Sequence, residues 1–248
     1  MRKRVLLAIA WALVPAQAFG QSGMVPPAEE VRVLVRPAER VELRSDIAAA
    51  VAKAPFDSGM RFQAGETLIA FDCRRFKAEL SSARAVASAA AIELRNKRRL
   101  LRHGAAGKSE VSLARAEAAR ADADVRARSA RMADCTITAP FAGRVVERRS
   151  RVHEMPRQGE PLMVILDDSR LELEIVVPSR WLTWLKPGAD FTVRLDETGT
   201  NHAARVERLG AEVDAVSQTV RVFGRLKDDA QGVLAGMSGR ARFRGAGS

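Results

Sequence analysis

Apolar residues recur every seven positions through the middle of the chain, over residues 74–134. This segment is rich in Ala, Arg, Glu and Leu, which are strong helix formers, and it contains no Pro. Two apolar rows per heptad are typical of helices that pair along a seam, so the pattern predicts a coiled-coil hairpin with two arms. The rows are Leu80, Ala87, Leu94, Leu101 and Phe76, Ala83, Ala90 in the first arm, and Val111, Ala118, Val125, Met132 and Ala114, Ala121 in the second.

The two arms meet at a short break, residues 103–107, whose two Gly residues end a helix. Ser109 is the expected N-cap of the second arm. Because the break is short, the arms are predicted to be antiparallel neighbours, each about 40 Å long at 1.5 Å per residue. Lys97 and Arg128 interrupt the apolar rows. Two interpretations stay open: a solvated coiled coil, or a projecting arm whose Arg-rich faces dock on other helices.

Two similar blocks of sequence flank the hairpin. Each block begins with the pattern Gly-Glu-x-Leu, continues with a short apolar run and ends in Asp. The first block runs from Gly65 to Asp72 and the second from Gly159 to Asp167. A Gly-containing turn followed by an apolar run indicates a turn and then a strand. The weak repeat therefore predicts two half-motifs that pair into one small β domain, which the hairpin interrupts.

Short strands at regular spacing are predicted after the second block. Polar and apolar residues alternate over residues 171–177 and again over 191–195, with a Trp-containing helical turn between them. Turns rich in Gly, Pro and Asp separate these from three further runs, which indicates a small β-barrel or sandwich. The further runs are residues 204–209, 219–226 and 240–243.

The block Ala-Pro-Phe-Ala-Gly-Arg-Val at residues 139–145, the paired halves and the inserted hairpin carry a family resemblance. Together they resemble the periplasmic adaptor subunits of bacterial efflux and secretion systems, the membrane fusion proteins of the HlyD type. The resemblance implies a mixed β fold with an α-helical coiled-coil hairpin: a lipoyl-like (barrel-sandwich hybrid) domain split by the hairpin, followed by a small β-barrel. The implied divisions are a signal peptide (1–20), an extended segment (21–40), lipoyl-like halves (41–72 and 136–167), the hairpin (73–135) and the barrel (168–248).

A lipoyl or biotinyl carrier is the competing interpretation of the paired halves. Such a domain needs a Lys on the tight turn that joins its halves, and here the predicted helices of residues 74–134 take that place. Lys53 lies within the first half, before Gly59 of its motif and far from that turn, where it cannot serve. The three His residues are far apart, and no nucleophile, base and orienting group come together in the sequence. We therefore expect no enzyme activity, catalytic residue, cofactor or metal site.

The N-terminus has the pattern of an export signal. Arg2, Lys3 and Arg4 precede an apolar run at residues 5–14, which is shorter than the roughly 20 residues that span a membrane. Ala-Gln-Ala at residues 16–18 then offers a cleavage site. A cleaved signal peptide is expected, with a short signal anchor as the alternative. The protein is then exported, and periplasmic in a Gram-negative bacterium, which argues against nucleic acid as a partner.

The surplus of positive charge lies in the predicted hairpin. The chain has a formal net charge of +11, from 41 Lys and Arg against 30 Asp and Glu. Three of the positive residues belong to the export signal, and residues 74–134 hold 15 Lys and Arg against 7 Asp and Glu. The rest of the chain is neutral. The sequence therefore predicts a neutral body with one cationic arm, which suits either an acidic partner surface or simple solvation.

Family members that serve TolC-type channels carry Arg, Leu and Ser at fixed spacing at the hairpin tip. Arg98 and Ser109 match the Arg and the Ser, whereas Arg102 stands where Leu is expected and Leu101 lies one residue early. The resemblance implies that these four residues dock the tip on an outer-membrane channel. The alternative is that Arg98 is solvated and that Ser109 only caps its helix.

The two Cys residues lie at the feet of the predicted hairpin, Cys73 before it and Cys135 after it. Antiparallel arms bring their feet together, and an exported protein meets oxidising conditions, so a disulfide is expected. The alternative is a pair of buried free thiols.

The predicted function is that of an exported, non-enzymatic adaptor. It would link an inner-membrane transporter to a TolC-type outer-membrane channel as one copy in a homo-oligomeric ring. A further membrane-proximal domain, present in larger family members, is expected to be missing or much reduced, because the sequence stops at Ser248. The alternative function is an exported module whose coiled coil binds another envelope partner without transport.

Overall fold

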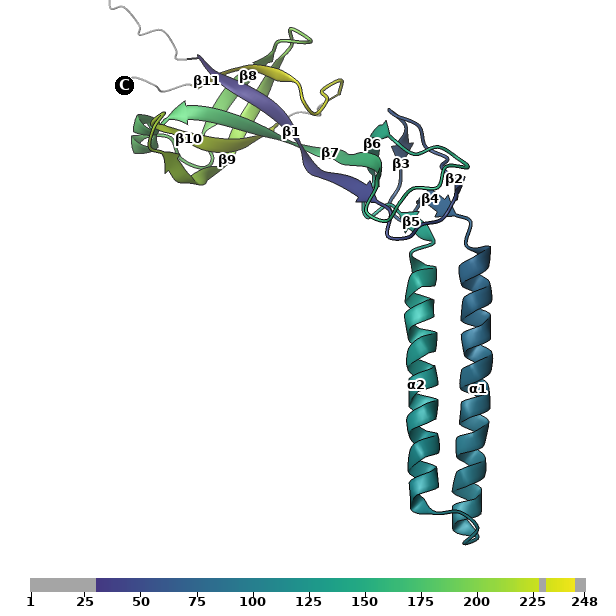
Figure 1. Ribbon diagram of the computed structural model, residues 1–248. Helices are drawn as coiled ribbons and strands as arrows, with labels where there is room; N and C mark the ends of the chain where they lie inside the picture. Colours follow the sequence, from purple (N-terminus) through teal and green to yellow (C-terminus); the bar gives the residue numbers. More distant parts are fainter. Residues whose placement is uncertain (1–29, 228–230, 244–248) are drawn as a thin grey trace, which may run out of the picture.

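The computed structural model describes residues 30–227 and 231–243, and its strands form two modules from which one pair of helices projects (Figure 1). The predicted signal peptide, residues 1–20, lies outside the described residues. The strands are β1 (Glu30–Arg44), β2 (Val51–Lys53), β3 (Arg61–Phe62), β4 (Thr67–Phe71), β5 (Thr136–Thr138), β6 (Gly143–Arg148), β7 (Pro161–Pro178), β8 (Asp190–Leu195), β9 (Asn201–Asp214), β10 (Thr219–Leu226) and β11 (Ser238–Phe243). The helices are α1 (Arg74–Arg102), α2 (Lys108–Ala133) and a short 3-10 turn, η1 (Ser179–Thr183).

Six antiparallel strands close into a ring, which we call the ring module. Their order is β1-β11-β8-β9-β10-β7, and β7 pairs back with β1. Side chains alternate between the inside and the outside, so that Phe191, Val193 and Leu195 of β8 are buried while the residues between them are exposed. Trp181 of η1 packs against Phe243, with ring centroids 5.4 Å apart. The period-2 pattern of these strands therefore gives the ring a single apolar core.

The first strand of the ring corrects the sequence analysis, which sets residues 21–40 apart from the strands near the C-terminus. In the structure, Glu30 to Leu34 pair with β11, and Val33 to Pro37 pair with β7. Val33 and Val35 are buried in the ring core. Their alternation with polar neighbours is visible in the sequence. The pairing is not, because it joins the two ends of the described chain.

The second group of strands, the base module, carries the helices. It contains β2 to β6 together with the second half of β1 and the first half of β7. β2, β4 and β5 form a small sheet, and β3 and β6 extend the pairing of β7. Its core is separate from that of the ring, and its most buried members are Val51, Phe62, Leu68, Ile69, Val145, Leu162, Met163 and Ile165.

The repeated Gly-Glu block forms the same turn twice in the base module. Gly65 and Gly159 have φ of 81° and 82°, which Gly adopts without strain. The carboxylates of Glu66 and Glu160 each accept a hydrogen bond of 2.8 Å from the amide three residues earlier. Each turn also exchanges two backbone hydrogen bonds with one residue, Ala139 for the first and Ser45 for the second. The sequence repeat is therefore a repeat of backbone geometry.

Gly143 lies where β6 comes closest to β7. A Cβ added at Gly143 would sit 2.1 Å from the carbonyl oxygen of Leu166 and 3.3 Å from the ring of Phe62. Real Cβ atoms do not approach a backbone oxygen so closely, so any side chain would push the two strands apart. This contact gives a physical reason for Gly in the Ala-Pro-Phe-Ala-Gly block.

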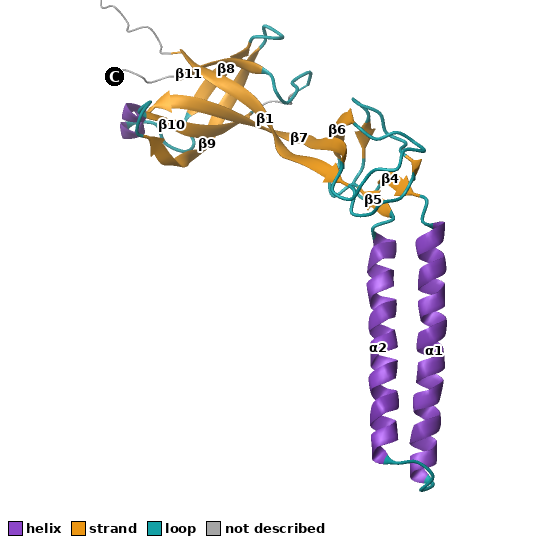
Figure 2. Ribbon diagram, in the orientation of Figure 1, coloured by secondary structure: helices purple, strands orange, loops and turns teal. Residues whose placement is uncertain are grey.

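Helices α1 and α2 run antiparallel and extend away from both modules (Figures 1 and 2). At 29 residues and 1.5 Å per residue, α1 is about 44 Å long. The buried helical residues all lie at positions of the predicted apolar rows: Leu80, Ala83, Ala87, Val111, Ala118 and Ala121. Neither of these helices, nor any other helix in the described part of the chain, is apolar over a stretch long enough to cross a bilayer.

Candidate functional site

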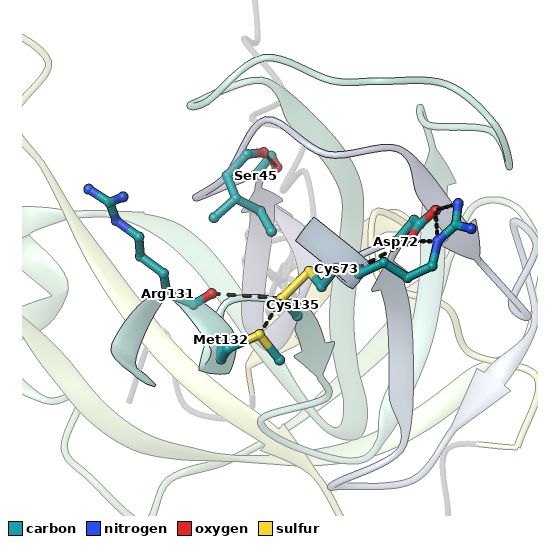
Figure 3. Close-up of a disulfide and its surroundings, with 8 residues drawn as sticks. Ser45, Asp72, Cys73, Arg131, Met132 and Cys135 are labelled. Carbon is teal, nitrogen blue, oxygen red and sulfur yellow. Dashed lines mark hydrogen bonds and ion pairs between the residues drawn. A yellow bond between two sulfur atoms is a disulfide. The ribbon is translucent and has the colours of Figure 1, made fainter. Parts of the chain in front are cut away.

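A disulfide joins Cys73 and Cys135 at the feet of the two helices (Figure 3). Cys73 directly precedes α1, and Cys135 follows α2 after one residue, Asp134, with the two Cα atoms 6.1 Å apart. Sγ of Cys135 lies 4.0 Å from Sδ of Met132. The Cys135 carbonyl accepts a 2.9 Å hydrogen bond from the Phe71 amide, which ties the foot of α2 to β4. The structure thus contains the disulfide expected from the sequence, set against the base-module core.

Asp72 compensates for an unfavourable start of α1. The first turn of this helix has no acidic residue and begins with Arg74 and Arg75. Their positive charges lie at the positive end of the helix dipole, which is unfavourable. One carboxylate oxygen of Asp72 accepts a hydrogen bond of 3.2 Å from the Arg74 amide, and the other lies 2.6 Å from the Arg74 guanidinium. These hydrogen bonds hold the pKa of Asp72 below its ordinary value. Asp72 therefore acts as the cap that Cys73 cannot provide.

The two cations that interrupt the apolar rows pair across the helices. Nζ of Lys97 on α1 lies 3.3 Å from Oε1 of Glu110 on α2. Near the feet, Nη1 of Arg128 on α2 lies 3.4 Å from Oε2 of Glu79 on α1. All four side chains are partly exposed, so each pair contributes little to stability. Because each pair joins a residue of α1 to a residue of α2, these pairs favour the observed alignment of the helices.

The tip of the helical pair lies at the end farthest from both modules (Figure 1). Arg98, Leu101 and Arg102 lie in the last two turns of α1, and Ser109 lies in the first turn of α2. Arg98, Arg102 and Ser109 are exposed, and Leu101 is half-buried. The fold therefore brings the four sequence-predicted tip residues to one end of the molecule, with three of their side chains in solvent.

Ser109 is not the N-cap of α2, which corrects the sequence analysis. The helix begins at Lys108, so Gly107 is the N-cap and Ser109 lies inside the first turn. Glu110 reaches back instead, and its Oε2 accepts a hydrogen bond of 3.0 Å from the Gly107 amide. The signal for this was a Glu three positions after a possible cap residue, the second half of a capping box. Ser109 has no capping role here, which leaves its hydroxyl free for a partner.

Glu110 is expected to control fraying of the tip. The Gly107 amide and Lys97 lower its pKa below the ordinary value, so the carboxylate form is favoured in the folded protein. A lowered pKa adds stability above the unfolded-state pKa, about 4.3 for Glu, and this stability is lost as pH falls below it. In Glu110→Gln, amides of the first turn of α2 should exchange hydrogen several-fold faster at neutral pH, measured by mass spectrometry. Ser109→Ala serves as the matched control, and equal exchange in both variants would contradict the assignment of the cap.

The described residues hold no group of three or more His, Cys, Asp or Glu side chains placed to bind a metal ion.

No protein-family model matches the chain. The nodulation protein NolF of Rhizobium meliloti (strain 1021) is 26% identical over 227 residues, covering 84% of this chain and 61% of NolF. An uncharacterized protein of Haemophilus influenzae (strain ATCC 51907) is 25% identical and is covered over 56% of its length. The chain spans about three fifths of the length of the curated relatives it matches.

Solved structures align with most of this chain. The membrane fusion protein Spr0693 of Streptococcus pneumoniae R6 aligns with a TM-score of 0.73 over 87% of this chain and 98% of its own, at 13% identity. A MacA–MexA chimeric protein with the Pseudomonas aeruginosa MexA α-hairpin domain gives 0.74 over 87% and 78%, at 15% identity. The chain has the fold of a membrane fusion protein. This confirms the resemblance that the sequence indicated, and with it a mostly β fold that carries two helices.

The arm of this membrane fusion protein fold is covered with unpaired cations. Arg120, Arg74 and Arg75 have acidic partners on their own segment, as do the two cations in the apolar rows. Among the described residues, ten others on the helices form no ion pair. They are Lys77, Arg84, Arg95, Arg98, Arg99, Arg102, Lys108, Arg115, Arg126 and Arg131. The positive surplus seen in the sequence therefore lies on the surface of the arm.

Proposed function

We propose that this protein is a periplasmic, non-enzymatic adaptor that links an inner-membrane transporter to an outer-membrane channel for efflux or secretion. The single observation that carries the proposal is the helical arm of about 44 Å, which projects from a two-module body with the membrane fusion protein fold. Such an arm reaches a partner that the body does not touch. In this proposal the base module is a lipoyl-like domain split by a coiled-coil hairpin, and the ring module is the β-barrel domain.

The relative positions of the parts support the roles. In the proposal several copies pack through their base and ring modules into a ring, and the arms point together toward a TolC-type channel. Ten unpaired cations on each arm would repel one another in a bundle of bare arms, so an acidic partner surface is needed to balance them. A cleaved export signal at residues 1–20 would deliver the protein to the periplasm.

The tip residues are expected to contact the channel directly. A photo-crosslinking amino acid at Arg98 or Ser109 should capture the channel subunit in cells, because both side chains are exposed at the tip. The matched control is Ser129, an exposed position near the feet of the helices, which should capture neighbouring adaptor copies and no channel. Mass spectrometry of the crosslinked bands identifies the partner.

Two outcomes would count against the proposal. Equal channel capture from Ser109 and Ser129 would show that the arm lies along the channel without tip docking. Capture of another envelope protein at the tip, with no channel and no transporter, would favour a binding module that takes no part in transport.

A further inference from the structure

A cleft between the base module and the ring module is lined by arginines. Part of its lining is β7, the strand that passes from one module to the other (strand shown in Figure 1). The base module contributes Arg61 of β3 and Arg144 of β6, and the ring module contributes Arg225 near the end of β10. The passing stretch of β7 adds Asp168 and Arg170. Four guanidinium groups thus share the cleft with one carboxylate.

Asp168 cannot neutralise the arginines that contact it. Its Oδ2 lies 2.9 Å from Nη2 of Arg61 and 3.4 Å from Nε of Arg144, so one negative charge serves two positive groups. The carboxylate is nearly buried, with 11% of its side chain exposed, which limits its screening by water. Charge is therefore left over on the base-module side of the cleft.

The Nε–H group of Arg144 has no hydrogen-bond acceptor among the described residues. The nitrogen is buried, and despite its proximity to Asp168 it makes no hydrogen bond with the described residues. A buried donor without an acceptor is costly, and native structures seldom leave one without a partner. One of the arginines that line the cleft thus has a donor without an acceptor among the described residues.

Two further arginines that line the cleft also offer positive charge. Arg170 is exposed and forms no ion pair with the described residues. Arg225 has one partner, Glu207, 3.2 Å away and outside the residues that line the cleft. The guanidinium groups that line the cleft carry forked N–H donors, whose geometry matches the oxygens of phosphate.

We propose that this cleft binds a phosphate-class oxyanion between the two modules. The anion accepts hydrogen bonds from Arg61 and Arg144 of the base module, from Arg170 of the connecting stretch of β7 and from Arg225 of the ring module. A dianion suits a lining with four cations and one anion better than a monocarboxylate does. Because its ligands come from both modules, the bound anion holds them in a fixed relative orientation. This site is independent of the channel-docking role of the arm.

Isothermal titration calorimetry on the full chain with inorganic phosphate tests the proposal, at an ionic strength held constant with sodium chloride. Arg170→Gln should weaken phosphate binding by about tenfold, because it removes a charged donor that has no structural partner to lose. Arg144→Gln should weaken it as strongly. The matched control is Arg157→Gln, an exposed arginine outside the cleft, which should bind phosphate like the unaltered protein.

Titrations with two further compounds identify the ligand class. Acetate should bind more weakly than phosphate, and glycerol 3-phosphate should match phosphate if the natural ligand is a phosphomonoester on a larger molecule. Stronger binding of free phosphate than of the ester would point to the free ion. The proposal is overturned if phosphate does not bind. It is also overturned if Arg170→Gln and Arg144→Gln bind it as well as Arg157→Gln does, since binding would then be to diffuse surface charge.

Discussion

Replacing both Cys73 and Cys135 with Ser is expected to lower the free energy of unfolding by about 4 kcal/mol. The disulfide joins residues 62 positions apart, and the chain-entropy relation gives this value for a loop of that length. The closed loop contains both helices, whose buried contacts are mostly between Ala residues. Such a narrow interface buries little apolar area, so the covalent link at the feet carries much of the hairpin's stability. Urea unfolding followed by circular dichroism, which reports on the helices, measures the effect.

Reduction provides the control for this experiment. The unaltered protein in dithiothreitol should unfold at the same urea concentration as the double Ser variant, and the variant should not respond to dithiothreitol. An unfolding midpoint shared by the oxidised protein and the double variant would contradict the expected contribution. A response of the variant to dithiothreitol would show that the reagent acts in some other way.

Gly143→Ala is expected to destabilise the base module by on the order of 3 kcal/mol. The added Cβ would lie 2.1 Å from the Leu166 carbonyl oxygen, and backbone cannot move aside as a flexible side chain can. β6 must separate from β7, which disturbs the pairing of Arg144 with Leu166 and the packing of Phe62. Thermal unfolding measured by differential scanning calorimetry should show a lower transition temperature.

Gly107→Ala is the matched control for this substitution. A Cβ at Gly107 would meet only the Ser109 hydroxyl, at 3.5 Å, and its backbone has a φ of −85° that Ala adopts easily. Its transition temperature should stay close to that of the unaltered protein. If the two Gly variants lose the same stability, the close approach of β6 and β7 is not what requires Gly143.

Structural features that depend on residues close together in the sequence were predictable. The apolar rows depend on a seven-residue period, and the buried helical residues, from Leu80 to Ala121, fall on them. The repeated turn was visible because a positive φ demands Gly and the carboxylate that closes the turn demands an acid at the next position. Cys73 and Cys135 were paired by the same local logic, since antiparallel helices bring their feet together.

Features that depend on distant partners were not predictable. β1 alternates like any strand, but only the closed ring shows that it pairs with both β11 and β7. Ser109 fits the preferences for an N-cap, yet the N-cap is Gly107, two residues earlier, whose amide Glu110 can reach. The arginine cleft draws on β3, β6, β7 and β10, and no spacing in the sequence joins these segments.

The two long strands also determine how this molecule can be divided. β1 begins in the ring module and ends in the base module, and β7 begins in the base module and ends in the ring module. The chain therefore crosses between the modules twice without a linker. The ring module is therefore built from both ends of the described chain, and the base module with its helices is an insertion within it. Neither β module can be excised or exchanged by cutting at one peptide bond, because each cut would divide a strand that both cores require. The helical arm is different, since only its two feet connect it to the rest, and it can be lengthened, shortened or replaced while both cores stay whole.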